Sequence, residues 1–167
     1  TDMFYTYQDI AVKDREERQN CDCILKRGVS VLVLDSRLEI RPDYIKSFKY
    51  TITGNCGNVF NPSTGHCLEK TTLTKTYDIS GNQYKGKKIM FSSYFFLGED
   101  NVTDITLATQ SVDTENNVAK ELSFENVHMV KGKMTTYKGP FLSTHSAASF
   151  IIDSPTIPDS GFSTEFE

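Results

Sequence analysis

The stretch from Leu122 to Leu142 reads LSFENVHMVKGKMTTYKGPFL and decides the fold of this chain. Its first half carries apolar residues at the spacing of a β-strand, and a second such run follows from Met134 to Tyr137. Between them, Val130 to Lys133 supply the Lys and Gly residues of a short turn. Two alternating runs joined by a short turn are typical of a β-hairpin, so we expect a hairpin here.

Further runs of the same kind lie on both sides of this stretch. They are rich in Thr, Val, Ile, Tyr and Phe, they are separated by Gly, Pro, Asn and Asp, and no helical period of useful length occurs. The expected strands are Met3–Val12, Cys21–Leu34, Ile45–Thr53, Val59–Phe60, Leu68–Ile79, Ile89–Leu97, Val102–Gln110, Val118–Phe124 and Ser149–Asp153. Many short strands of this kind predict an all-β protein, an antiparallel β-sandwich.

Three of these runs carry more detailed expectations. Gly28 interrupts the run Cys21–Leu34, which predicts a bulge or bend where a central strand changes its partner or its sheet. Leu68–Ile79 is polar and rich in Thr, so we expect it near a sheet edge. Ile89–Leu97 is apolar at both parities, which indicates burial on both faces, or burial on one face with a loop that covers the other.

The length and the charge limit the class of protein. A chain of 167 residues fits one domain, which we expect to span residues 1–153 and to be followed by an extended tail at 154–167. A net charge of −4 with no cluster of Lys and Arg argues against a nucleic-acid partner. No apolar run reaches eighteen residues, so we expect no transmembrane span.

The first residues, Thr1-Asp2-Met3, show no signal-peptide pattern. Because the chain begins at Thr and not at Met, we expect that a preceding segment has been removed. Such a segment would carry any export signal and any lipid anchor.

The four cysteines, Cys21, Cys23, Cys56 and Cys67, allow three disulfide pairings. We favour a disulfide between Cys56 and Cys67, which closes a short loop and removes roughly 2 to 3 kcal/mol of unfolded-state freedom. There are two alternatives. In one, Cys21 and Cys23 each pair with one of the later two cysteines; in the other, all four cysteines are free thiols. A zinc site that includes His66 is disfavoured, because Cys-x-Cys on a strand has too little slack for two ligands. We therefore predict no metal and no cofactor.

No pattern of catalytic residues is present in the sequence. Gly-x-Ser-x-Gly, His-Glu-x-x-His and phosphate-loop motifs are all missing, and His66, His128 and His145 fall in turns or at strand ends. The run Ser143 to Ser146 places hydroxyls beside an imidazole, but neighbours on one loop rarely form a catalytic triad. We predict that the chain is not an enzyme.

Short motifs occur in a fixed order along most of the chain. They begin with an aromatic segment before a charged spacer, continue with Leu-Lys-Arg before an apolar strand, and end with Asn-Val, Thr-Thr and Gly. The motifs are DMFYTY at Asp2–Tyr7, ILKRGVSVLVL at Ile24–Leu34, FNPSTG at Phe60–Gly65, YFFL at Tyr94–Leu97, ITL at Ile105–Leu107, FENV at Phe124–Val127 and GKMTTYKG at Gly132–Gly139.

In order and spacing these motifs resemble the fimbrillin-like proteins of Bacteroides-type bacteria, a family of pilus shaft, tip and anchor subunits. The chain departs from that family at His128, where the family has Pro, and in its cysteines, which are not a family feature. The resemblance implies a Greek-key, transthyretin-like sandwich. It also implies export as a lipoprotein to the cell surface and outer membrane.

The function implied by the resemblance is a structural or adhesive fimbrial subunit without catalysis. Its partners would be other fimbrial subunits, joined by β-strand complementation, or a host or bacterial surface ligand. The tail Thr156 to Phe166, with Ile157, Phe162 and Phe166, fits a donated strand and equally fits a frayed terminus.

The alternative function is a carbohydrate-binding or other ligand-binding surface lipoprotein module. Two aromatic runs, Tyr94 to Phe96 and Phe4 to Tyr7, carry the rings for a sugar platform. Aromatic runs inside strands are nevertheless more often part of a core.

Overall fold

The computed structural model describes residues 3–11, 20–144 and 149–156, and within them the chain is all-β. One short 3-10 helix, η1 (Asn82–Tyr84), is the sole helical element of this described part, and no helix there is long and apolar enough to cross a membrane. The strands are β1 (Phe4–Tyr5), β2 (Lys26–Arg27), β3 (Ser30–Asp35), β4 (Ile45–Gly54), β5 (Cys56–Gly57), β6 (Phe60–Asn61), β7 (His66–Cys67), β8 (Leu73–Asp78), β9 (Met90–Leu97), β10 (Val102–Asp113), β11 (Val118–Val130), β12 (Met134–Lys138) and β13 (Ile151–Thr156).

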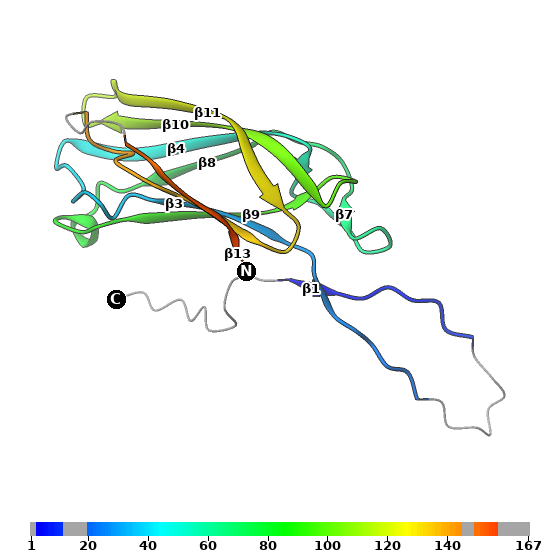
Figure 1. Ribbon diagram of the computed structural model, residues 1–167. Coiled ribbons are helices and arrows are strands. Elements are labelled where there is room, and N and C mark those ends of the chain that lie inside the picture. The colour runs from blue at the N-terminus through cyan, green and yellow to red at the C-terminus, as the bar shows by residue number, and fades with distance from the viewer. Residues whose placement is uncertain (1–2, 12–19, 145–148, 157–167) are drawn as a thin grey trace.

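Two main sheets pack face to face (Figure 1). One has the order β11-β10-β4-β8 and the other the order β13-β12-β3-β9-β5, while β1-β2 and β6-β7 form two small ribbons. All described strand pairs are antiparallel except β12 and β3, which run parallel. The expected all-β class with antiparallel sheets is confirmed, and the parallel pair is an addition to it.

The core lies between the two sheets and is built by alternation along each strand. In β4, Phe48, Tyr50 and Ile52 are buried while the residues between them are partly exposed, as the sequence pattern predicts. Phe48 stacks on Phe91 of the opposite sheet with ring centroids 4.2 Å apart. The largest fully buried side chains are Phe48, Phe95, Phe141, Leu32, Leu34, Ile45, Ile52, Ile79, Leu97, Leu107, Met129 and Leu142.

The expected hairpin between Leu122 and Leu142 is wrong in one respect. Its strands and its turn exist, but β11 pairs with β10 whereas β12 pairs with β3 and β13, so the two strands lie in different sheets. Gly132 has a φ of 71°, which lets the chain pass from one sheet to the other. The Thr135 hydroxyl, which donates to the His128 carbonyl at 2.9 Å, links the two strands across the edge.

The first two expected strands are also shorter than the sequence predicts. Of the described residues 3–11 only Phe4–Tyr5 is in a sheet, and Cys21–Leu25 belongs to no sheet. Gly28 does mark a change of sheet, because β2 pairs with β1 before it and β3 enters the five-stranded sheet after it. β3 is that sheet's third strand of five, which confirms the expected central strand.

Two expectations about exposure have different outcomes. β8 is an edge strand, as its Thr-rich sequence predicts. β9 is buried on one face only, because Phe91 and Phe95 enter the core while Met90 and Tyr94 are 40% and 37% exposed on the outer face, with neither sheet nor loop of the described chain covering these two residues. The last strand, β13, continues past Asp153 to Thr156.

Candidate functional site

An arm projects from the two-sheet body at one end (Figure 1). We define the arm as the described residues 3–11 and 20–27, which leave the body together. At its base Phe4 pairs with Arg27 and Tyr5 pairs with Lys26, and the Gly28 N–H donates to the Met3 carbonyl at 3.0 Å. This short ladder is the root from which the arm extends.

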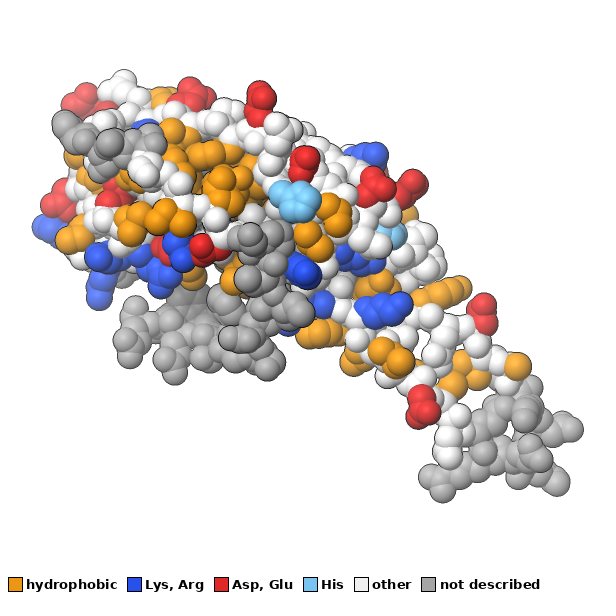
Figure 2. All heavy atoms as spheres, viewed as in Figure 1, with side chains coloured by type: hydrophobic (Ala, Val, Ile, Leu, Met, Phe, Trp, Pro, Cys, Tyr) orange, Lys and Arg blue, Asp and Glu red, His pale blue; other side chains and the backbone are white. Residues whose placement is uncertain are grey.

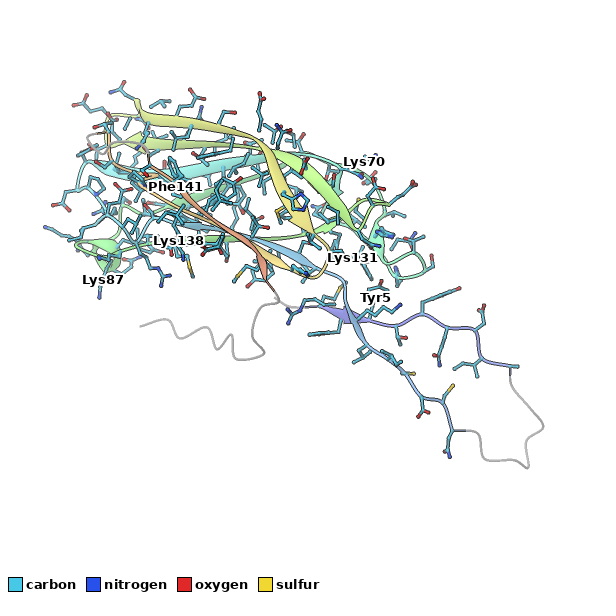
Figure 3. The ribbon with its side chains drawn as sticks, viewed as in Figure 1. Tyr5, Lys70, Lys87, Lys131, Lys138 and Phe141 are labelled. Atoms are coloured by element: carbon cyan, nitrogen blue, oxygen red, sulfur yellow. The ribbon has the colours of Figure 1, made fainter. Side chains whose placement is uncertain are left out.

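Aromatic and cationic contacts fix the base of the arm to the body. The Tyr5 ring packs edge-on against Phe60 at 5.0 Å, and Phe60 packs in turn against Phe96 of β9 at 4.8 Å. The Lys131 ammonium, from the turn between β11 and β12, donates to the Tyr5 hydroxyl at 3.0 Å (Figure 3). Gly65 lies so close that a Cβ there would be 1.9 Å from the Tyr5 hydroxyl oxygen. The arm is therefore held by a site that fits Tyr5 closely.

Beyond this base the arm exposes a large amount of apolar surface. The exposed fraction is 62% for Tyr7, 54% for Ile10, 77% for Ile24 and 62% for Leu25. Tyr7–Ile10 and Cys21–Ile24 make no main-chain hydrogen bond to another described residue. Extended chain with unpaired backbone groups and apolar side chains is a template for pairing with another strand. The arm is thus the leading candidate for contact with another protein.

The cysteines of the arm face one polar side chain. The Gln8 side-chain amide donates to the Cys21 sulfur at 3.2 Å and to the Cys23 sulfur at 3.7 Å, and both thiols are free and exposed. Among the described residues, no group of three His, Cys, Asp or Glu side chains could hold a metal ion.

Cys56 and Cys67 are both free thiols in the structure. Cys56 is buried in β5, and Cys67 on β7 lies close enough to influence its ionisation. Burial, with a smaller effect from Cys67, raises the pKa of the Cys56 thiol to about 11. The chain thus brings together the two cysteines for which the sequence favours a disulfide, and their pairing stays a prediction.

A groove of about 280 Å³ lies on the outer face of the five-stranded sheet. Its charges are already paired, because Arg37 binds both carboxylate oxygens of Asp35 at 2.8 and 2.9 Å and Lys138 binds Asp153 at 2.6 Å. Hydrogen bonds from Arg37 lower the pKa of Asp35 below its usual value. The lining is Val33, Asp35, Arg37, Met90, Met134, Thr136, Lys138 and Asp153. With its charges paired and no aromatic ring in its lining, the groove offers a ligand little to bind.

The aromatic runs do not form continuous platforms. Phe95 is fully buried between the sheets, while Tyr94 is partly exposed on the outer face and Phe96 packs on Phe60. In the arm, Phe4 lies under the Arg27 guanidinium at 5.2 Å and Tyr5 packs into the base. Each run is therefore divided between separate environments.

The histidines and the other candidate residues that the sequence singles out do not come together in one place. His128 Nδ1 lies 3.1 Å from an Asp104 carboxylate oxygen on the exposed face of β10 and β11, while His66 lies on β7. His145, Ser146, Ile157, Phe162 and Phe166 lie outside the described residues.

Sequence reasoning missed the exposure of the arm. The available signal for an arm was the charged spacer from Lys13 to Asn20. This spacer lies between two apolar runs, and the second run is interrupted at Gly28. It indicates two strands with a connection, but it does not reveal that their apolar side chains lack a core.

The family model named DUF6562 matches residues 1–165, which include the arm and both sheets. The chain belongs to this family. DUF6562 is a family of unknown function, so membership assigns no activity. No curated protein and no solved structure matches the chain.

We expect the cysteines of this DUF6562 chain to react with iodoacetamide in two classes. At pH 8, Cys21 and Cys23 should be alkylated within minutes, because both thiols are exposed. Cys56, with a pKa of about 11, should stay unmodified, since only about one thiol in a thousand is ionised and the side chain is buried. Peptide mass spectrometry with and without urea measures the difference. Equal labelling of Cys56 and Cys21 in the native protein would contradict this expectation.

Proposed function

We propose that this chain is a non-enzymatic, fimbrillin-like structural or adhesive subunit of a bacterial surface fimbria, assembled by β-strand complementation. The observation that carries the proposal is the position of β13. This strand, the last in the described part of the chain, lies at the edge of the five-stranded sheet and pairs with β12, whose other neighbour is the parallel strand β3. A strand at a sheet edge can be exchanged for a strand of another copy, because it has a neighbour on one side only.

The contacts of β13 suit an exchangeable strand. Ile151 and Ile152 are 54% and 59% exposed although they point to opposite faces, so these two side chains bury little apolar surface. The preceding Phe150 supplies an anchor, with its ring 5.0 Å from both Phe124 and Phe141. A donated segment would therefore be recognised by one aromatic anchor and by main-chain pairing with β12.

The finer features of the proposal come from the fimbrillin-like resemblance. They are a Greek-key, transthyretin-like strand arrangement, export as a lipoprotein, and location at the outer membrane in a fimbria. The two facing sheets, antiparallel except for the β12–β3 pair, are compatible with that arrangement.

Strand exchange in trans is the test of this function. We would insert a protease site between Thr144 and Ser149, fold the intact chain, cleave it, and add a labelled peptide of residues 149–167. The peptide should replace the endogenous segment, as measured by fluorescence anisotropy. Peptide with Phe150→Ala should bind at least about tenfold more weakly, because its anchor is lost. A cleaved, folded protein that never exchanges its last strand would refute complementation.

A carbohydrate-binding or other ligand-binding surface lipoprotein module is the second candidate. The half-exposed Tyr94 ring on the outer face of β9 is the observation in its favour. Glycan-array binding that disappears with Tyr94→Ala would support it over the fimbrial subunit.

A further inference from the structure

The segment from Cys21 to Arg27 of the arm is self-complementary. We propose that it pairs antiparallel with the same segment of a second copy, about a two-fold axis at Ile24. This register places Asp22 opposite Lys26 of the other copy, and Cys23 opposite its Leu25. The two-fold axis repeats each pair, so two Asp–Lys contacts flank one central Ile–Ile contact.

The exposure of the segment singles out the same centre. Ile24, at 77%, is the most exposed of the large apolar side chains in the described chain, and its neighbour Leu25 is 62% exposed. Antiparallel pairing about Ile24 would cover both side chains in each copy and give main-chain partners to Cys21–Ile24, which have none among the described residues. A partner at this centre therefore covers two of the most exposed large apolar side chains in the described part of the chain.

Charge along the arm favours a second copy as the partner. Lys26 and Arg27 lie in the β1–β2 ladder at the base, where Lys131 contacts Tyr5, whereas Asp9 and Asp22 are farther from this ladder along the chain. Figure 2 shows basic side chains where the arm joins the body and acidic side chains farther out. Residues 12–19 carry three acidic and three basic side chains, so their formal net charge is zero. Two antiparallel arms therefore place the acidic end of each beside the basic base of the other.

The charged residues at the centre of the segment are available for such pairing. Asp22 and Lys26 are exposed, and neither has an ion-pair or side-chain hydrogen-bond partner among the described residues. In the proposed register each meets an opposite charge directly across the strand pair, which is the favourable arrangement.

The shape of the molecule permits this contact. The arm points away from the body, so the bodies of two copies would lie at opposite ends of the paired segments (Figure 1). A strand as long as this segment spans roughly 23 Å. Two strands of that length bury less surface than the roughly 1,600 Å² of a standard protein–protein interface. We therefore expect a dimer that dissociates on dilution. The inference does not rest on the fimbrial function, since a two-fold contact closes as a dimer whereas strand exchange at β13 extends into a chain.

A charge swap in the full chain tests the register. Sedimentation under reducing conditions should show a monomer–dimer equilibrium for the native sequence. Asp22→Lys alone and Lys26→Glu alone should each weaken dimerisation at least about tenfold, because each places like charges opposite one another twice. An equimolar mixture of the two variants should form heterodimers with close to native affinity. Both substitutions are at exposed arm positions, so neither threatens the core.

Cross-linking locates the axis independently of affinity. In a chain with Cys21→Ser and Cys23→Ser, Ile24→Cys should form a disulfide-linked dimer when oxidised glutathione accepts the two electrons and two protons of the thiols. Leu25→Cys in the same background should not, because it faces position 23 of the other copy, where the Cys23→Ser substitution has removed the thiol. A native chain that stays monomeric at all concentrations, single variants that dimerise normally, or a mixture that does not recover would each overturn the inference.

Discussion

Phe48→Ala is expected to lower the free energy of unfolding by about 4 kcal/mol. The Phe48 side chain is fully buried, stacks on Phe91 at 4.2 Å and meets Phe141 edge-on at 6.1 Å. Removing the ring leaves a cavity between the two sheets, because neither β4 nor β9 can move inward without breaking its ladder. Urea unfolding followed by circular dichroism gives the free energy directly.

The matched control deletes the same atoms at an exposed site. Phe4 in the arm is 51% exposed and contacts the Arg27 guanidinium at 5.2 Å, so Phe4→Ala should cost less than about 1 kcal/mol. Equal decreases in the free energy of unfolding at the two positions would show that side-chain packing between the sheets is not the main source of stability.

The burial of Phe48 could be read from the sequence, and the reason is local. Strict alternation in Ile45–Thr53 requires one apolar face, and a face of Phe48, Tyr50 and Ile52 has to be covered. The change of sheet at Gly28 could be predicted in the same way, because a glycine inside an apolar run indicates a break in the strand. These features depend on residues that are neighbours along the chain.

The partner of each strand could not be read in the same way. Between Leu122 and Leu142 the alternation is equally compatible with a hairpin and with a chain that crosses to the other sheet, since both need two strands and a turn. The outcome depends on β3, which takes β12 as a parallel neighbour about a hundred residues away in sequence.

The arm shows the same limit for the candidate site. Cys21–Leu25 has the composition of a buried strand, yet its apolar residues are exposed because no second layer lies over them. The self-complementary order Asp22, Ile24, Lys26 is visible in the sequence, but it gains meaning only once the structure places it outside the body. Likewise, the contact of Tyr5 with Gly65 and Lys131 joins three distant segments.

Gly65→Ala is expected to detach the base of the arm from the body. Gly65 has a φ of 74°, and an added Cβ would lie 1.9 Å from the Tyr5 hydroxyl oxygen and 2.9 Å from the Lys131 ammonium nitrogen. Tyr5 must then leave its place on Phe60, with the loss of an aromatic contact and a hydrogen bond worth about 2 kcal/mol together. That loss corresponds to about a thirtyfold rise in the population of molecules in which the arm is detached from the body.

Amide hydrogen exchange at Gly28 measures this change, because its N–H donates to the Met3 carbonyl at 3.0 Å in the seated arm. Gly86→Ala is the matched control, since Gly86 has a φ of 69° and nothing lies within 4 Å of an added Cβ. Both variants share the backbone strain of about 1 kcal/mol, but only Gly65→Ala displaces Tyr5. Exchange at Gly28 should therefore accelerate about thirtyfold in Gly65→Ala and stay unchanged in Gly86→Ala. If exchange is equally slow in both, the arm is held by contacts other than those of Tyr5.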